Sequence, residues 1–179
     1  MDLPLHPVLV HLPMALAVVV PLIAVGTWLA WYRGFLPARS WLVVVALQAL
    51  LVGGGAVSME SGEDDEERVE RVVAEQRIEA HEDAATAFMV GAGIVLGLSV
   101  LAGGVMFRNE ALGRVLAGVA TLGTLAVLGL GVRVGHMGGE LVYKYGAASA
   151  HTPAGAGQPA GSGEGPAVSQ RGEHDDDDD

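Results

Sequence analysis

Four long stretches of almost uninterrupted apolar residues divide the chain, at about residues 7–32, 41–58, 84–107 and 111–134. Each is close to the ~20 residues that a helix needs to cross ~30 Å of hydrocarbon, and none has Lys, Asp or Glu in its middle. A buried helix of a soluble bundle would carry a polar face at helical spacing, and these stretches have none. The pattern therefore predicts an all-α integral membrane protein, with a four-helix up-down bundle over residues 1–146.

Prolines and glycines refine the predicted helices. The first stretch lacks a basic leader region and is too long for a typical signal-peptide core, so we expect it to be retained as a helix. Pro13 and Pro21 lie inside it and are expected to kink it, because each removes a backbone donor. Two GxxxG patterns, Gly93–Gly97 and Gly131–Gly135, predict close helix packing, since small residues let helix backbones approach each other in lipid.

The connections between the stretches indicate the topology. Two short connections carry arginine, whereas the connection at 59–83 is strongly acidic. Because short arginine-bearing loops stay cytoplasmic, we expect the acidic segment and both termini on the extracytoplasmic side of the cell inner membrane. An aromatic belt at the inner interface fits this orientation, and its expected members are Trp28, Trp31, Tyr32, Phe35, Trp41 and Phe107.

Two polar segments complete the chain. Residues 64–80 place Val69, Val72 and Val73 at helical spacing among charges, which predicts a short amphipathic helix on the outer surface. Residues 147–179 are rich in Gly, Ala, Pro and Ser and end in a run of aspartates. Such a composition has little to bury, and a disordered acidic tail is the expectation.

Composition narrows the function classes. Of the 179 residues, 51% are hydrophobic and only 17% charged, and the formal net charge is −11. The acidic balance argues against nucleic-acid binding, while the apolar stretches make the lipid bilayer the first expected partner and leave a homo-oligomer open. The absence of cysteine excludes a disulfide framework and covalent c-type haem. Neither a catalytic triad nor a nucleotide-binding fingerprint is evident, so enzymatic activity stays open and a non-catalytic redox or binding subunit is favoured.

The histidines carry the candidate chemistry. His6 and His11 open the first stretch, His81 precedes the third, and His136 follows the fourth. In an up-down bundle these positions all lie at the extracytoplasmic side. His11 lies about one turn inside its stretch, where an ionisable group is expected to face the protein interior. The topology therefore predicts a histidine cluster near the outer face.

Three functions are compatible with such a cluster. The leading hypothesis is electron transfer through haem b, which needs two axial histidines from different helices and a cation for its propionates. Its candidate residues are His6, His11, His81, His136 and Arg133. The second hypothesis is a zinc, copper or iron site with three or four ligands, and its candidates are His11, His81, His136 and Glu60. In the third, the protein is a structural or anchor subunit whose histidines only pack and form hydrogen bonds.

Three motifs resemble a bacterial protein family. They are LHPVLVHLPMAL at 5–16, EAHEDAA at 79–85 and GHMGGELVYKYG at 135–146. Together they are similar to the predicted four-helix membrane proteins catalogued as domain of unknown function 2231, over about residues 4–146. The resemblance implies four membrane spans and makes the four histidines named above motif positions. It also implies a role beside cytochrome-type and Rieske-type redox domains, with a membrane or periplasmic redox protein as partner.

Overall fold

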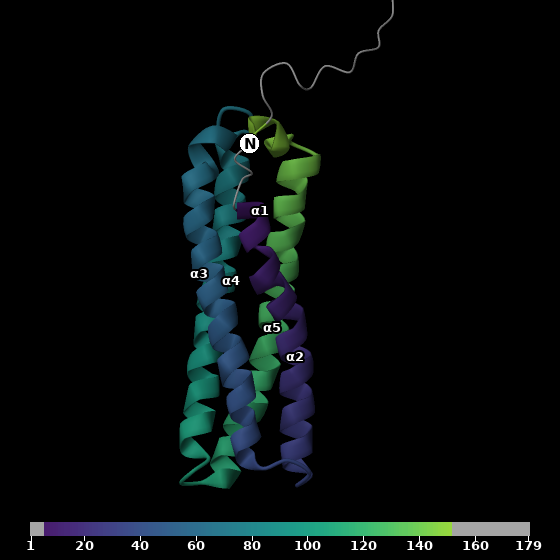
Figure 1. Cartoon of the computed structure of the whole chain (residues 1–179), viewed down its shortest axis with the longest axis vertical. Coiled ribbons are helices and arrows are strands. Elements are labelled where there is room, and N and C mark those ends of the chain that lie inside the picture. The colour runs from purple at the N-terminus through teal and green to yellow at the C-terminus, as the bar shows by residue number, and fades with distance from the viewer. Residues whose placement is uncertain (1–5, 152–179) are drawn as a thin grey trace, which may run out of the picture.

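The computed structural model describes residues 6–151, except for the side chain of Asp65, and this part of the chain contains helices and no strands. The long helices are α2 (His11–Tyr32), α3 (Leu42–Val69), α4 (Glu75–Val105) and α5 (Glu110–Tyr143), and α2 continues the short α1 (His6–Leu9). Two 3-10 helices, η1 (Ala38–Trp41) and η2 (Ala147–His151), complete the described elements. Successive long helices run in opposite directions (Figure 1). The predicted four-helix up-down bundle is confirmed, and all four helices are long and apolar enough to cross a membrane.

The up-down order separates two kinds of charge along the bundle. The connections α2–α3 and α4–α5 lie at one end, which we call the arginine end, together with Arg33, Arg39, Arg108 and Arg114. The α3–α4 turn, the start of α1 and the end of α5 lie at the other, which we call the acidic end (Figure 1). The helix ends that carry the candidate histidines therefore share one end of the bundle, as predicted.

Small side chains fill the inside of the bundle. Seven alanines are at most 4% exposed, namely Ala17, Ala24, Ala84, Ala92, Ala102, Ala117 and Ala120. Between 28% and 33% of the most apolar window of each helix is buried. Most apolar side chains therefore point outward, which suits a lipid environment because lipid, unlike water, does not penalise exposed hydrocarbon.

Indole rings tie the helices together near the arginine end. Trp28 Nε1 donates to the carbonyl of Arg114 at 2.9 Å, and Trp31 Nε1 donates to Glu110 Oε1 at 3.0 Å. Trp41 Nε1 donates to the carbonyl of Ser99 at 3.1 Å. Trp31 and Trp41 are buried. These two residues therefore belong to the core, which corrects their expected place in the aromatic belt. The Trp41 N–H reaches the buried Ser99, whereas the Trp31 N–H reaches the exposed Glu110 at the start of α5.

Tyr32, Phe35 and Phe107 keep the exposure that the predicted belt requires, at 61%, 77% and 72%. The belt is therefore smaller than the sequence suggested, and its exposed members lie next to the arginine-bearing connections.

The two GxxxG patterns have different surroundings. A Cβ on Gly131 would lie 3.3 Å from the Phe88 ring, so this glycine lies in a helix contact as predicted. Gly93 and Gly97 are exposed, and an added Cβ would meet nothing within 4 Å. Their predicted packing role is therefore wrong, because α4 presents a different face, which includes Phe88 and Ala92, to the bundle.

The closest α4–α5 approaches use glycines outside these patterns. A Cβ on Gly113 would lie 2.7 Å from the Cα of Met106, and one on Gly123 would lie 2.6 Å from Val95 Cγ2. An added Cβ at Gly113 would require the Met106 backbone to move, whereas one at Gly123 would require the Val95 side chain to shift.

The predicted surface helix at 64–80 is not a separate element. Helix α3 continues to Val69 and α4 begins at Glu75, so these residues extend the two long helices on either side of a short turn. The apolar positions of this segment are nevertheless used. Val73 and Ile78 are buried against Ala147, and Val69 packs at the edge of the same cluster. The apolar spacing reflects this internal cluster rather than a membrane surface.

The two prolines of the first stretch differ in their effect on the helix. The helix break at Val10 lies where Pro13 lacks the N–H that would bond to the Leu9 carbonyl, whereas α2 continues through Pro21.

Of the predicted disordered tail, residues 147–151 form η2, which corrects that part of the prediction, since Ala147 is held in the apolar cluster. Residues 152–179 lie outside the described part of the chain.

Candidate functional site

His6 and His81 come together at the acidic end, and we call them the histidine pair. His6 begins α1 and lies against α3, while His81 lies near the start of α4. Both are partly buried. A charge on His6 would act on His81 through space, while the hydrogen bonds of His6 go to α3. The up-down topology thus joins two residues that are far apart in the chain.

The hydrogen bonds of His6 define its tautomer. Its Nδ1 lies 2.9 Å from the carbonyl oxygen of Ser58 and 3.1 Å from Ser61 Oγ. Because a carbonyl can only accept, Nδ1 carries the hydrogen, and in the neutral ring Nε2 keeps a free lone pair. An Nδ1–H bonded to a backbone carbonyl is the usual way in which a protein orients a histidine for metal ligation through Nε2.

His81 has an unusual environment for a polar ring. Its Nδ1 is buried and has no hydrogen-bond partner among the residues that the structure describes. A buried polar atom without a partner costs about 1–3 kcal/mol, which makes such an atom in a native protein a candidate for a ligand contact.

Glycines provide the space for both rings. A Cβ on Gly62 of α3 would lie 3.2 Å from His6 Cε1, and a Cβ on Gly138 of α5 would lie 3.2 Å from His81 Cε1. The histidine pair therefore occupies room that ordinary side chains at these two positions would restrict.

The other predicted histidines lie on the outer surface. His11 is exposed, two positions before the buried Pro13, so the two residues point to opposite faces of α2. The expectation that His11 faces the interior is therefore corrected. His136 is exposed on α5, and so is Arg133, three residues before it.

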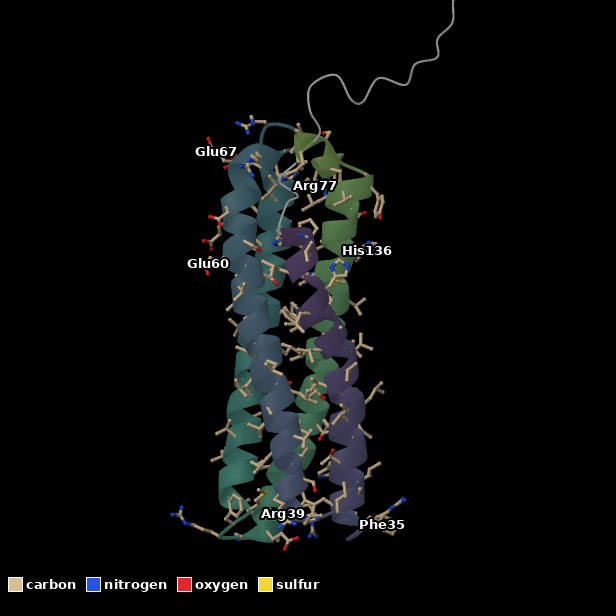
Figure 2. The ribbon with its side chains drawn as sticks, viewed as in Figure 1. Phe35, Arg39, Glu60, Glu67, Arg77 and His136 are labelled. Atoms are coloured by element: carbon tan, nitrogen blue, oxygen red, sulfur yellow. The ribbon has the colours of Figure 1, made fainter. Side chains whose placement is uncertain are left out.

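Glu60 completes the set of predicted residues. It is exposed on α3 and lies across the bundle from His136 (Figure 2). Residues 6–151, apart from the side chain of Asp65, contain no group of three or more His, Cys, Asp or Glu placed to hold a metal ion. The expected cluster of four imidazoles is thus reduced to a pair, because its members share one end of the bundle but lie on different helix faces.

Some partners of the pair were not identified from the sequence. Ser58, Ser61 and Gly62 are spaced i, i+3 and i+4, so they form one face of α3 toward His6, while Glu60 points away. This spacing was the available signal for Ser58, Ser61 and Gly62. Gly138 lies inside the GHMGGELVYKYG motif, but nothing in the motif indicates which of its glycines contacts His81.

Comparisons with known proteins gave one result. A family described as "Predicted membrane protein (DUF2231)" matches residues 2–151. No curated protein and no solved structure matches the chain. The match includes both members of the histidine pair and all four long helices.

Proposed function

The chain belongs to the DUF2231 family of predicted membrane proteins, and from this premise we propose that it is an electron-transfer protein that holds haem b between His6 and His81. The proposal is carried by two partly buried imidazoles from different helices at the acidic end, one oriented by a carbonyl and the other with a buried nitrogen that has no hydrogen-bond partner among the described residues.

The number of ligands favours haem over a single metal ion. Haem iron takes four nitrogens from its porphyrin and needs only two axial ligands from the protein. A zinc or copper ion takes three or four protein ligands, and the described residues offer no group of three. A pair of histidines in a four-helix bundle is therefore a better match to haem than to the transition-metal alternative.

The surroundings of the pair support the same assignment. The Ser58 carbonyl fixes the orientation of His6, so Nε2 is the atom available for iron. The absence of side chains at Gly62 and Gly138 lets the two rings pack against α3 and α5. When bound, haem would supply reversible one-electron chemistry, while the helices hold its ligands and limit the access of water.

We further propose that the acidic end faces the extracytoplasmic side of the inner membrane, with the arginine end in the cytoplasm. The short arginine-bearing connections favour this orientation. It places the histidine pair near the outer face, where a membrane or periplasmic redox protein is the expected partner.

A reduced-minus-oxidised spectrum of the full chain, purified in mild detergent from haem-replete cells, tests the proposal. We expect a b-type haem spectrum that His6→Ala or His81→Ala abolishes. His11→Ala and His136→Ala are the matched controls, because both remove an exposed imidazole, and they should retain the spectrum.

Two additions make the result decisive if an alanine variant fails to fold. His81→Met retains an axial ligand, so it should alter the spectrum and raise the midpoint potential rather than abolish binding. A stoichiometric metal without a Soret band would overturn the haem proposal in favour of a metal site. A preparation with neither haem nor metal would leave a structural subunit.

A further inference from the structure

A layer of polar residues crosses the middle of the bundle. It separates two hydrophobic clusters of the core, one nearer the arginine end and the other nearer the acidic end. On each long helix, the stretch between the two clusters includes a buried polar side chain or a buried proline. These residues, which we call the polar layer, are Pro21, Gln48, Ser99, Thr121 and Thr124. All four long helices therefore contribute to the polar layer.

Two side-chain oxygens of the polar layer are enclosed without a hydrogen-bond partner. Gln48 is 1% exposed and Ser99 is 0% exposed. Neither Gln48 Oε1 nor Ser99 Oγ has a partner within the part of the chain that the structure describes. Such atoms are costly in the interior of a membrane protein, where bulk water does not reach them, so a partner for both is expected.

Both oxygens belong to the contact between α3 and α4. Gln48 Nε2 donates to the Ala92 carbonyl at 3.2 Å, and the Trp41 indole donates to the Ser99 carbonyl at 3.1 Å. Ser99 follows Ala92 by two turns on the same face of α4. Gln48 and Ser99 therefore lie between the same pair of helices and between the same two hydrophobic clusters.

The polar layer has too few donors for its acceptors. Thr121 Oγ1 and Thr124 Oγ1 each donate their proton to a carbonyl of α5, at 2.8 Å and 2.7 Å. Neither proton is therefore available to Gln48 Oε1, which can only accept. Pro21 has no N–H, so the Ala17 carbonyl also lacks its helical donor at this level of the bundle. A molecule that fits the layer must therefore donate hydrogen bonds.

We propose that a water molecule is bound in the polar layer and bridges Gln48 Oε1 and Ser99 Oγ. Water has two protons, so it supplies the donor that Gln48 Oε1 lacks and can serve Ser99 Oγ or the Ala17 carbonyl with the other. A buried water is held by about two to four polar partners, and these three oxygens meet that number. An alkali cation is a poorer match, because no residue of the layer has a carboxylate to offset a charge inside the membrane.

The bridging water would define how α3 is placed along α4. Contacts between small apolar side chains depend little on the exact position of one helix along the other. A hydrogen-bonded bridge has preferred directions, so it favours one position of Gln48 relative to Ser99.

Water-edited solid-state NMR of the full chain in proteoliposomes tests the site. Magnetisation is transferred from water to isotope-labelled glutamine side chains, and the Gln48 signal is identified by its loss in Gln48→Met. We expect transfer to Gln48 despite its burial. Ser99→Val replaces the hydroxyl by a methyl group and enlarges the side chain, so it should reduce this transfer by about twofold or more. Thr121→Val is the matched control and should leave the transfer unchanged, because its hydroxyl is bonded within α5.

A double-mutant cycle provides a second measurement if Ser99→Val does not fold. Gln48→Met and Ser99→Ala should each lower the midpoint of thermal unfolding in detergent. Because both remove the same bridge, Ser99→Ala should cause about half or less of its usual shift when Gln48→Met is already present. Gln48→Met combined with Thr121→Val is the control pair, and its two shifts should add.

Three results would overturn the bridging water. They are no transfer to Gln48, transfer that Ser99→Val leaves unchanged, and additive shifts for Gln48→Met and Ser99→Ala. An unfolding midpoint that rises with sodium chloride but not with choline chloride would assign the layer to a cation instead. His6→Ala should retain the transfer to Gln48, so the failure of the haem proposal would not affect this inference.

Discussion

At the scale of single residues, the position of the His81 ring depends on its contact with Gly138. Its ring lies where a side chain on Gly138 would otherwise be, and its Nδ1 is enclosed without a hydrogen-bond partner in the described part of the chain. His6, in contrast, is fixed by the Ser58 carbonyl. One member of the pair is thus held by a hydrogen bond and the other by packing, and substitutions that affect packing should act on His81 first.

Alanine substitutions at two adjacent glycines test this contact. Gly139→Ala should raise stability by about 0.5–1 kcal/mol, because it improves a helix interior and its Cβ meets nothing within 4 Å. Gly138→Ala should lose that gain, because its Cβ would displace His81. Thermal unfolding in detergent, followed by circular dichroism, measures the difference. An equal gain at both positions would contradict the His81–Gly138 contact.

The sequence predicted the shared end of the histidines but not their directions. The up-down order alone brings His6, His11, His81 and His136 to the acidic end. Which of them points inward depends on helix rotation, and the uniformly apolar stretches contain little information on it. His6 points inward and His11 points outward because Pro13 is buried in the bundle. The spacing of residues within the first stretch does not show which of its faces is buried.

At the scale of helices, the close contact between α4 and α5 depends on Gly113. Gly113→Ala should destabilise the protein by about 1–3 kcal/mol, because its Cβ would meet the backbone of Met106 at 2.7 Å and one helix would have to move. Gly97→Ala is the control, as nothing lies within 4 Å of the added atom. The midpoint of thermal unfolding reports both effects. A similar midpoint for the two variants would contradict the close approach.

Helix boundaries show which element-scale features were predictable. The apolar stretches predicted the four crossings, since membrane thickness sets their length. They did not predict that α3 and α4 extend well beyond these stretches at the acidic end. The extension depends on Val73 and Ile78 packing against Ala147, a contact between distant parts of the sequence. GxxxG spacing likewise predicts a helix face without large side chains, but it does not predict which helix, if any, packs against that face.

Orientation in the membrane belongs to the scale of the whole molecule, and the absence of native cysteine makes it directly measurable. Glu67 and Arg39 are exposed near opposite ends of the bundle (Figure 2). Glu67→Cys should react with a membrane-impermeant maleimide in intact spheroplasts, whereas Arg39→Cys should react only after permeabilisation. The reverse pattern would invert the proposed orientation, and equal reaction of both would contradict a membrane-spanning arrangement.

The alanine-lined interior has a consequence for how such a bundle is assembled and how it can change. Alanine has no rotatable side-chain torsions to immobilise, so the inserted helices associate with little loss of side-chain entropy. Because the neighbouring side chains are also small, they cannot change rotamer to make space for a larger residue. An enlarged side chain at Ala92 or Ala117 would push whole helices apart and carry that displacement along rigid rods to distant positions, so variation should be tolerated far more readily on the lipid-facing surface.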